Sequence, residues 1–245
     1  LEVAGSFIGD QSWVPNELEH AGRENRDPEH ATRYDLKEDA AAVQDVDYLC
    51  SAGIIKRESI VIDLGAGTGQ FAVAACERAG HVVAVDISSV MLEQLQMKIE
   101  RLGVSNVSCR LAGFLTYTHE GPPADLVYSR YALHHLPDFW KAMALMRMAT
   151  FLRPGGRLRL WDVVYSFDPA DAENTLGAWM NAFAPVGTSQ EWVRSDLEEH
   201  IRDENSTFSW LLEPMLEKAG FAIEEAEYSA DQIFAKYLCV RRSRG

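Results

Sequence analysis

The stretch IVIDLGAGTGQFA, residues 60–72, decides the fold of this chain. It begins with an apolar run typical of a buried strand, reaches an acid at Asp63, and continues with Gly65, Gly67 and Gly69. A strand that leads through a glycine turn into a helix is the arrangement with which α/β proteins bind nucleotides. Such a turn could hold a dinucleotide, a nucleoside triphosphate or a nucleoside sulfonium.

Strand and helix patterns alternate from residue 40 onward. The expected strands cover residues 59–64, 81–87, 107–112, 124–129, 157–164, 221–228 and 232–242. The expected helices cover residues 39–53, 69–80, 89–103, 139–152, 189–204 and 209–220. Because strand–helix–strand units require right-handed crossovers, this order predicts an α/β, Rossmann-like, doubly wound sheet of seven mostly parallel strands. The last strand is expected to be antiparallel.

The site is expected at the carboxyl ends of these strands, where ligands of doubly wound sheets bind. Residues 166–209 lack the strand pattern and are expected to form a helical lid. Four parts are therefore expected: an N-terminal helical arm at 1–47, a cofactor-binding core at 48–165, the insertion at 166–209 and the end of the core at 210–245.

The net charge of −14 is concentrated in two segments. Residues 1–47 contain 12 acids and 4 bases, and residues 162–232 contain 16 acids and 3 bases. Nucleic-acid binders need a positive stripe, and only the short tail KYLCVRRSRG offers one. The charge pattern disfavours a DNA or RNA partner, and it favours a neutral or cationic small molecule.

Two further patterns narrow the class of protein. No apolar run approaches the roughly 20 residues of a membrane helix, and the first residues lack the features of a signal peptide, so a soluble, cytoplasmic protein without a membrane partner is expected. The four cysteines have no metal-ligand spacing, so neither a structural zinc nor a disulfide framework is expected. The sequence indicates no metal site and leaves the oligomeric state open.

The glycine loop favours one of the three ligand classes. A dinucleotide fingerprint needs a third glycine where this chain has Gln70, and no phosphate-loop GK[ST] follows. Asp63 would repel a pyrophosphate but could hold an ammonium group. Asp86 ends the next strand 21 residues after Gly65, where an acid can accept hydrogen bonds from a ribose diol. The pattern indicates a nucleoside with a cationic end.

Four segments in order, VIDLGAGTG, VVAVDIS, ADLVYSRYALHHLPD and FLRPGGRL, resemble the class I S-adenosylmethionine-dependent methyltransferases, in their broad small-molecule branch. The resemblance implies S-adenosylmethionine as cofactor and S-adenosylhomocysteine as product. It implies the following binding residues: Asp63, Gly65, Ala66 and Gly67 for the methionine end, Asp86 for the ribose, Ile87 and Met91 for the adenine, Ser129 and Arg130 beside the methionine, and Tyr34 in an arm over the cofactor.

One position departs from the family pattern. After the third strand the family usually has an acid that accepts from the adenine amino group, and this chain has Gly113 there. We expect backbone, water or another residue to take over this contact, with Phe114 close enough to stack.

Methyl transfer is an in-line displacement that depends mainly on positioning, so few side chains are obligatory. A base is needed only where the acceptor must lose a proton. His134 and His135 are candidates, and because neighbours on a helix point about 100° apart, at most one is expected in the site. The resemblance favours His135, with a structural histidine as the alternative. Asp162 is a further candidate, with a cap or solvated turn as the alternative.

The expected activity is therefore methyl transfer to an oxygen, nitrogen or carbon atom of a small molecule. Methylation of tRNA or protein is the first alternative. The stretch SRYALHH after the fourth strand is unlike the Asn/Asp-Pro-Pro-Tyr/Phe of enzymes that act on amines of bases. A non-catalytic S-adenosylmethionine-binding protein is the second alternative, and Gln70 argues against a nicotinamide oxidoreductase.

Overall fold

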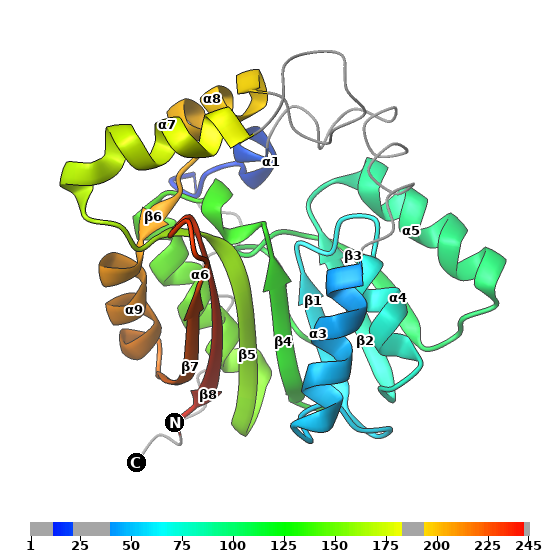
Figure 1. The fold of residues 1–245 in the computed structure, drawn as a ribbon. Coiled ribbons are helices and arrows are strands. Elements are labelled where there is room, and N and C mark those ends of the chain that lie inside the picture. Colours follow the sequence, from blue (N-terminus) through cyan, green and yellow to red (C-terminus); the bar gives the residue numbers. More distant parts are fainter. Residues whose placement is uncertain (1–11, 22–39, 183–193, 243–245) are drawn as a thin grey trace.

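The computed structural model describes residues 12–21, 40–182 and 194–242 (Figure 1). A single sheet has the strand order β3-β2-β1-β4-β5-β8-β7, and a short strand, β6, pairs with β5. The strands are β1 Ile60–Leu64, β2 His81–Asp86, β3 Val107–Leu111, β4 Ala124–Arg130, β5 Leu152–Tyr165, β6 Thr207–Phe208, β7 Phe221–Tyr228 and β8 Phe234–Arg241. The two pairs that involve β8, with β5 and with β7, are antiparallel, and the other pairs are parallel. The short β6 is an eighth strand beyond the seven predicted. The predicted Rossmann-like sheet with an antiparallel last strand is confirmed.

The strand order reverses at β1, which lies between β2 and β4 and is parallel to both. In this register Asp63 pairs with Ala84 on one side and with Tyr128 on the other. The carboxyl ends of β1, β2 and β4 therefore lie side by side, and the loops that follow them meet at one edge of the sheet. A crevice at such a reversal is where doubly wound folds bind their ligands.

Helices cover both faces of the sheet (Figure 1). One face packs against α3 Ala40–Ser51, α4 Gln70–Cys76 and α5 Ser89–Leu102, and the other against α6 Asp138–Phe151 and α9 Ser209–Lys218. Strand residues alternate between the two apolar layers: Val61 packs on the side of α3 and α4, and Ile62 on the side of α6. Continuous apolar strands are what a sheet covered on both faces requires.

The remaining helices lie above the carboxyl ends of the strands (Figure 1). They are α1 Glu17–His20, the 3₁₀ turns η2 Leu133–His135 and η3 Pro169–Asp171, α7 Ala172–Ala182 and α8 Arg194–Asp203. Phe167 and Trp179, aromatic residues of this region, are buried in an apolar cluster with Leu197. The division into arm, core and insertion stays a prediction. None of the helices in the described ranges combines the length and the apolarity that crossing a membrane requires.

The start of β5 differs from the prediction. The segment RPGG was expected to separate a helix from a strand beginning at residue 157, but β5 begins at Leu152. Ala124 of β4 pairs with Leu152, whereas Leu126 pairs with Arg157, so the residues between them form an irregularity in the ladder. Gly155, with φ of 73°, gives the backbone the left-handed conformation that this bulge needs.

A buried ion pair anchors α3 to the sheet. Arg159 Nη2 on β5 donates to Asp45 Oδ1 on α3 at 2.9 Å, and the Tyr128 hydroxyl donates to the other Asp45 oxygen at 3.3 Å. Both charged side chains are almost fully buried. Removing one partner of such a pair leaves an uncompensated charge in the protein interior.

We expect Asp45→Ala to lower the free energy of unfolding by about 3 kcal/mol, because Arg159 would remain buried without its carboxylate. Urea denaturation measures the change. Asp47→Ala on the same helix is the control, since its contact with Arg78 is long and exposed, and it should cost less than about 1 kcal/mol. Equal losses in the two variants would contradict this account of the ion pair.

Candidate functional site

The glycine loop after β1 is bonded to the end of β2. The N–H groups of Gly65 and Ala66 donate to Val85 O at 2.9 and 3.0 Å. The Asp86 carboxylate accepts from Gly67 N at 2.8 Å and, with its other oxygen, from Ser88 N at 2.8 Å. Asp86 therefore joins the two loops that the sequence singled out.

The three glycines of the loop serve two purposes. A Cβ on Gly65 would lie 2.3 Å from Ala132 Cβ, and one on Gly69 would lie 2.2 Å from Leu95 Cδ1. These two positions have no side chain because the protein packs against them. A Cβ on Gly67 would meet no protein atom within 4 Å among the described residues. Gly67 therefore leaves open space beside Asp86, where a ligand can lie against the backbone.

Two buried polar atoms beside this space have no hydrogen-bond partner within the described residues: Asp63 Oδ2 and Ser129 Oγ. Buried polar groups are rarely left unsatisfied in native proteins, so such atoms point to a ligand. Burial, and after it the nearby Asp86 charge, raise the pKa of Asp63 to about 8, against smaller lowering effects of a backbone hydrogen bond and Arg130. A cation bound here would satisfy the Asp63 carboxylate.

A carboxylate from the N-terminal part of the chain takes the position of the adenine-binding acid that is absent at Gly113. The Glu17 carboxylate, on α1, occupies the place of a side chain at Gly113, since a Cβ there would lie 2.3 Å from Glu17 Oε2. Glu17 Oε2 accepts from Leu115 N at 3.1 Å, whereas the buried Oε1 has no hydrogen-bond partner in the part of the chain described. Sequence reasoning missed Glu17, because nothing in a four-residue helix points to a site 98 residues away.

Burial raises the pKa of Glu17 more than the hydrogen bonds from Leu115 and its neighbours lower it, so that the pKa is about 7. Arg147, whose Nε donates to Phe114 O at 3.2 Å, also lowers it through its charge. A buried carboxylate with one free oxygen is a strong acceptor for an amino group.

The other predicted cofactor residues lie around this edge of the sheet. Phe114 is buried, with Cζ 3.7 Å from the position of a Cβ on Gly65. Ile87 is half-buried and Met91 is buried in the first turn of α5. The Arg130 guanidinium lies 4.2 Å from the centre of the Trp161 ring. Tyr34 lies outside the described residues.

His134 is held by two acids. Its Nδ1 lies 2.5 Å from Asp162 Oδ1, its backbone N donates to Asp162 Oδ2 at 2.9 Å, and its Nε2 lies 3.0 Å from Glu204 Oε2. Burial lowers the pKa of His134, but the charges of Asp162 and Glu204 outweigh it and raise the pKa to about 10. Asp162, buried near the end of β5, contacts both the ring and the backbone N–H of His134.

His135 has a different environment. Its Nδ1 is buried and makes no hydrogen bond to any described residue. Burial and the neighbouring His134 charge lower the pKa of His135 to about 3, so the ring is neutral and can accept a hydrogen bond. Ala132, three residues earlier, packs against Gly65, so the turn that carries both histidines adjoins the glycine loop. The roles of His134, His135 and Asp162 in the reaction stay predictions.

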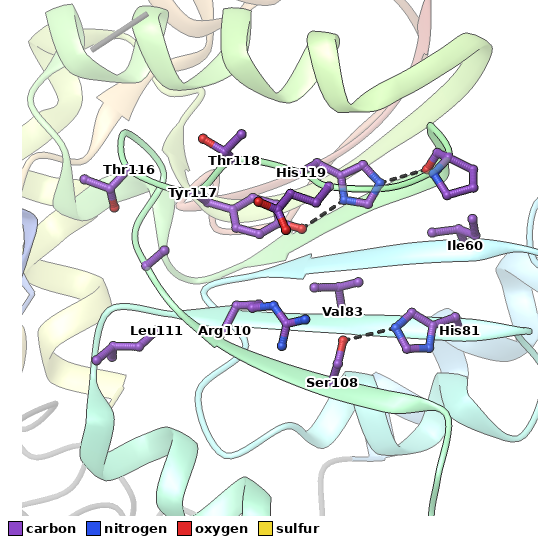
Figure 2. Close-up of a pocket in the computed structure, with 13 residues that line it drawn as sticks. Ile60, His81, Val83, Ser108, Arg110, Leu111, Thr116, Tyr117, Thr118 and His119 are labelled. Atoms are coloured by element: carbon purple, nitrogen blue, oxygen red, sulfur yellow. Dashed lines mark hydrogen bonds between the residues drawn. The ribbon is translucent and has the colours of Figure 1, made fainter. Parts of the chain in front are cut away.

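A separate groove lies along the sheet face near β2 and β3, under the segment 116–122 (Figure 2). His81 and Ser108, which are hydrogen-bonded at 3.0 Å, line its floor, and Tyr117 and His119 line the opposite side (Figure 2). The groove contains none of the residues of the glycine loop. It reaches the candidate site only at Thr116, which contacts Gly113 and Glu17.

Comparison with known proteins agrees with this geometry. Residues 61–156, which include the glycine loop, Asp86 and the turn after β4, match the model of a methyltransferase domain family. The chain contains a methyltransferase domain and is an S-adenosylmethionine-dependent methyltransferase, with a fold similar to that of the class I enzymes. The enzyme is 26% identical to an uncharacterised methyltransferase of Geobacillus kaustophilus over 75% of this chain and 79% of that protein.

Two other relatives show the breadth of the family. The tRNA 5-carboxymethoxyuridine methyltransferase of Escherichia coli is 27% identical over 66% of this chain and 59% of that protein. The structure of magnesium protoporphyrin IX methyltransferase from Synechocystis with bound S-adenosylhomocysteine superposes with a TM-score of 0.60 at 18% identity, over 83% of this chain and 82% of that one. The cofactor of this methyltransferase is S-adenosylmethionine, and the open space at Gly67, beside the Asp86 carboxylate, fits it.

We expect Asp63→Asn to make the methyltransferase more stable at pH 8 and to weaken its binding of S-adenosylhomocysteine. The raised pKa means that folded Asp63 keeps its proton between about pH 4 and pH 8, where the unfolded chain has lost it. Stability from this group is therefore full below about pH 4 and lost as the pH rises through about 8. An amide does not titrate, so the advantage of the variant should grow over this range.

Urea unfolding of the ligand-free variant and wild type at several pH values measures this difference. Calorimetry at pH 8 should show S-adenosylhomocysteine binding weakened about 10-fold, since a hydrogen bond to a charged group contributes about 1.5 kcal/mol. Parallel pH profiles of stability in the two proteins would contradict the assignment of Asp63 as a strained buried acid.

Proposed function

We propose that this methyltransferase transfers the methyl group of S-adenosylmethionine to a small, neutral or cationic acceptor. The acidic character of the helices over the site is the observation that carries this proposal. The helices over the site, α7 and α8, contain five acids and two arginines, and residues 162–232 as a whole contain 16 acids and 3 bases. A polyphosphate backbone that approached this surface would meet repulsion instead of counterion release.

The cofactor is proposed to lie across the edge of the sheet, from β4 to β3. Asp63 Oδ2 accepts from its ammonium group, and Asp86 keeps its two backbone bonds and accepts from the ribose hydroxyls with its further lone pairs. Glu17 Oε1 accepts from the amino group of the adenine, in place of an acid at Gly113. This proposal gives a ligand to each buried carboxylate oxygen that lacks a partner among the described residues at this edge.

We expect Glu17→Gln to weaken S-adenosylhomocysteine binding about 10-fold, because an amide that keeps the Leu115 bond turns its NH₂ toward the adenine amino group. Calorimetry should also show that wild type prefers S-adenosylhomocysteine over S-inosylhomocysteine, in which a carbonyl replaces that amino group. The Glu17→Gln variant should lose this preference.

Glu19→Gln is the matched control, because Glu19 is exposed on the same short helix. It should leave both affinities unchanged. A wild-type protein that binds the two ligands equally well would contradict the proposed role of Glu17. A uniform loss of affinity in Glu17→Gln with the preference retained would assign Glu17 a structural role only.

The acceptor is proposed to bind beside η2. The bound cofactor would supply an electrophilic methyl group on a sulfonium. The acceptor atom would attack this methyl group in line, and the sulfur would leave with S-adenosylhomocysteine. His135 would accept a hydrogen bond from the acceptor hydroxyl or amine and aim that atom at the methyl group. Asn205 Nδ2 donates to His135 O at 3.0 Å, and Asn205 N donates to His134 O at 3.0 Å, so the turn is held in place.

A panel of acceptors tests the substrate class. We expect S-adenosylhomocysteine release to be faster with neutral phenols and amines than with matched carboxylic acids, because the acids over the site repel anions. Raising the salt concentration should narrow this difference, since it screens charges. Faster turnover of anionic acceptors would contradict the charge argument.

Methylation of tRNA is the second candidate, and the 27% identity to the Escherichia coli tRNA enzyme is the observation that favours it. Unmodified tRNA therefore belongs in the same panel. Salt-sensitive methylation of tRNA, with no turnover of small acceptors, would decide for this candidate. Binding of the cofactor with no turnover of any acceptor would decide for a non-catalytic binding protein.

A further inference from the structure

A cluster of two histidines and one glutamate lies where the lid meets the core. His134 comes from η2, and His200 and Glu204 come from α8 and the residue after it. One ligand atom from each residue lies within 4.8 Å of the others. The side chains of His134 and His200 are 7% and 3% exposed, and that of Glu204 is 16% exposed, so the cluster is shielded from bulk water.

Two imidazole nitrogens crowd one carboxylate oxygen in this cluster. Glu204 Oε2 lies 3.0 Å from His134 Nε2 and also beside His200 Nδ1, yet it has no hydrogen-bond partner among the described residues. A hydrogen-bond acceptor lies on the N–H axis. In a metal site the ion lies on that axis instead, and the other ligand atoms lie off it. Two ligand atoms that each bind the ion tetrahedrally at about 2.0–2.1 Å are about 3.3 Å from each other.

In each imidazole ring, the nitrogen that faces away from Glu204 contacts an oxygen atom, as in metal-binding histidines. His134 Nδ1 contacts Asp162 Oδ1 at 2.5 Å, and His200 Nε2 lies 3.0 Å from Ser206 Oγ. Partners of this kind fix the ring orientation and leave the other nitrogen free to bind an ion. Both rings therefore have their remaining nitrogen beside Glu204 Oε2.

We propose that His134 Nε2, His200 Nδ1 and Glu204 Oε2 bind a divalent transition-metal ion of the zinc class. Two histidines and one glutamate are an established zinc ligand set, with a fourth position for water or another group. The ion takes the place of the proton between His134 and Glu204. Its two positive charges balance the carboxylates of Asp162, which is buried, and of Glu204, which is largely shielded.

The proposed ion joins the lid to the core. Its ligands come from the turn after β4 and from α8, which are 66 residues apart in the chain. Lys141 of α6 donates to Asn205 O, next to Glu204. This hydrogen bond also ties the segment after α8 to the core. The ion would hold α8 over the turn that carries His135. The proposal does not depend on the identity of the acceptor.

Metal analysis of the full-length chain, purified without a histidine tag or chelator, tests the proposal. We expect inductively coupled plasma mass spectrometry to find about one zinc ion per chain. After the ion is removed with a chelator, Co²⁺ should bind with the visible absorption of a four-coordinate site, and Zn²⁺ should displace it and raise the unfolding temperature.

Variants identify the ligands. Glu204→Gln and His200→Ala should each weaken Co²⁺ binding by about 100-fold, and Ser206→Ala by about 10-fold. His81→Ala is the matched control, because His81 also contacts a serine but lies at the amino end of β2, and it should bind Co²⁺ like wild type. Calorimetry with S-adenosylhomocysteine shows whether each variant is folded and tests the cofactor site separately.

The proposal is wrong if wild type contains no metal and shows no cobalt absorption on titration. It is also wrong if cobalt binds equally well to wild type and to a folded Glu204→Gln variant. In either case the cluster is a proton-bridged contact between the lid and the core.

Discussion

The carboxylate of Asp86 holds together the two loops on which the site depends. It accepts from Gly67 N in the loop after β1 and from Ser88 N in the loop after β2. Because β1 lies between β2 and β4 in the sheet, this contact fixes the glycine loop at the point where the strand order reverses. The open face of Gly67, the orphaned oxygen of Asp63 and the turn with His135 all take their positions from this arrangement.

The site is a place where the protein gives up stability for binding. Asp63 and Glu17 are buried carboxylates whose pKa values burial raises to about 8 and about 7, and each has an oxygen without a hydrogen-bond partner among the described residues. Such groups are costly in the ligand-free protein. A cationic methionine end and an adenine amino group would satisfy them, so the binding energy of the cofactor includes relief of this cost.

Most of the fold could be predicted from the sequence, because its signals are local. Apolar strands, the Ser88 cap and the Gly103 stop of α5 each act within a few residues of their own position. The glycine loop and Asp86 could be predicted for the same reason, since each ends its own strand. The bulge at Gly155 could not, because its residues have the composition of a turn and only pairing with β4 makes them part of a strand.

The missed residues act over long distances in the chain. Glu17 reaches Gly113 only because α1 folds over the sheet, and no pattern in the sequence indicates that contact. His200 and Glu204 are four residues apart, a spacing that puts both on one side of a helix, and this signal could have been noticed. Their third partner, His134, could not be predicted, because only the docking of α8 on η2 brings it near.

A crystal structure of the complex with S-adenosylhomocysteine tests the central claim most directly. The account predicts the ribose against Gly67 and Asp86, the ammonium group at Asp63 Oδ2 and the adenine amino group at Glu17 Oε1. A ligand bound away from Gly67, or an adenine amino group that faces solvent with Glu17 still bonded only to Leu115 and Thr116, would contradict it.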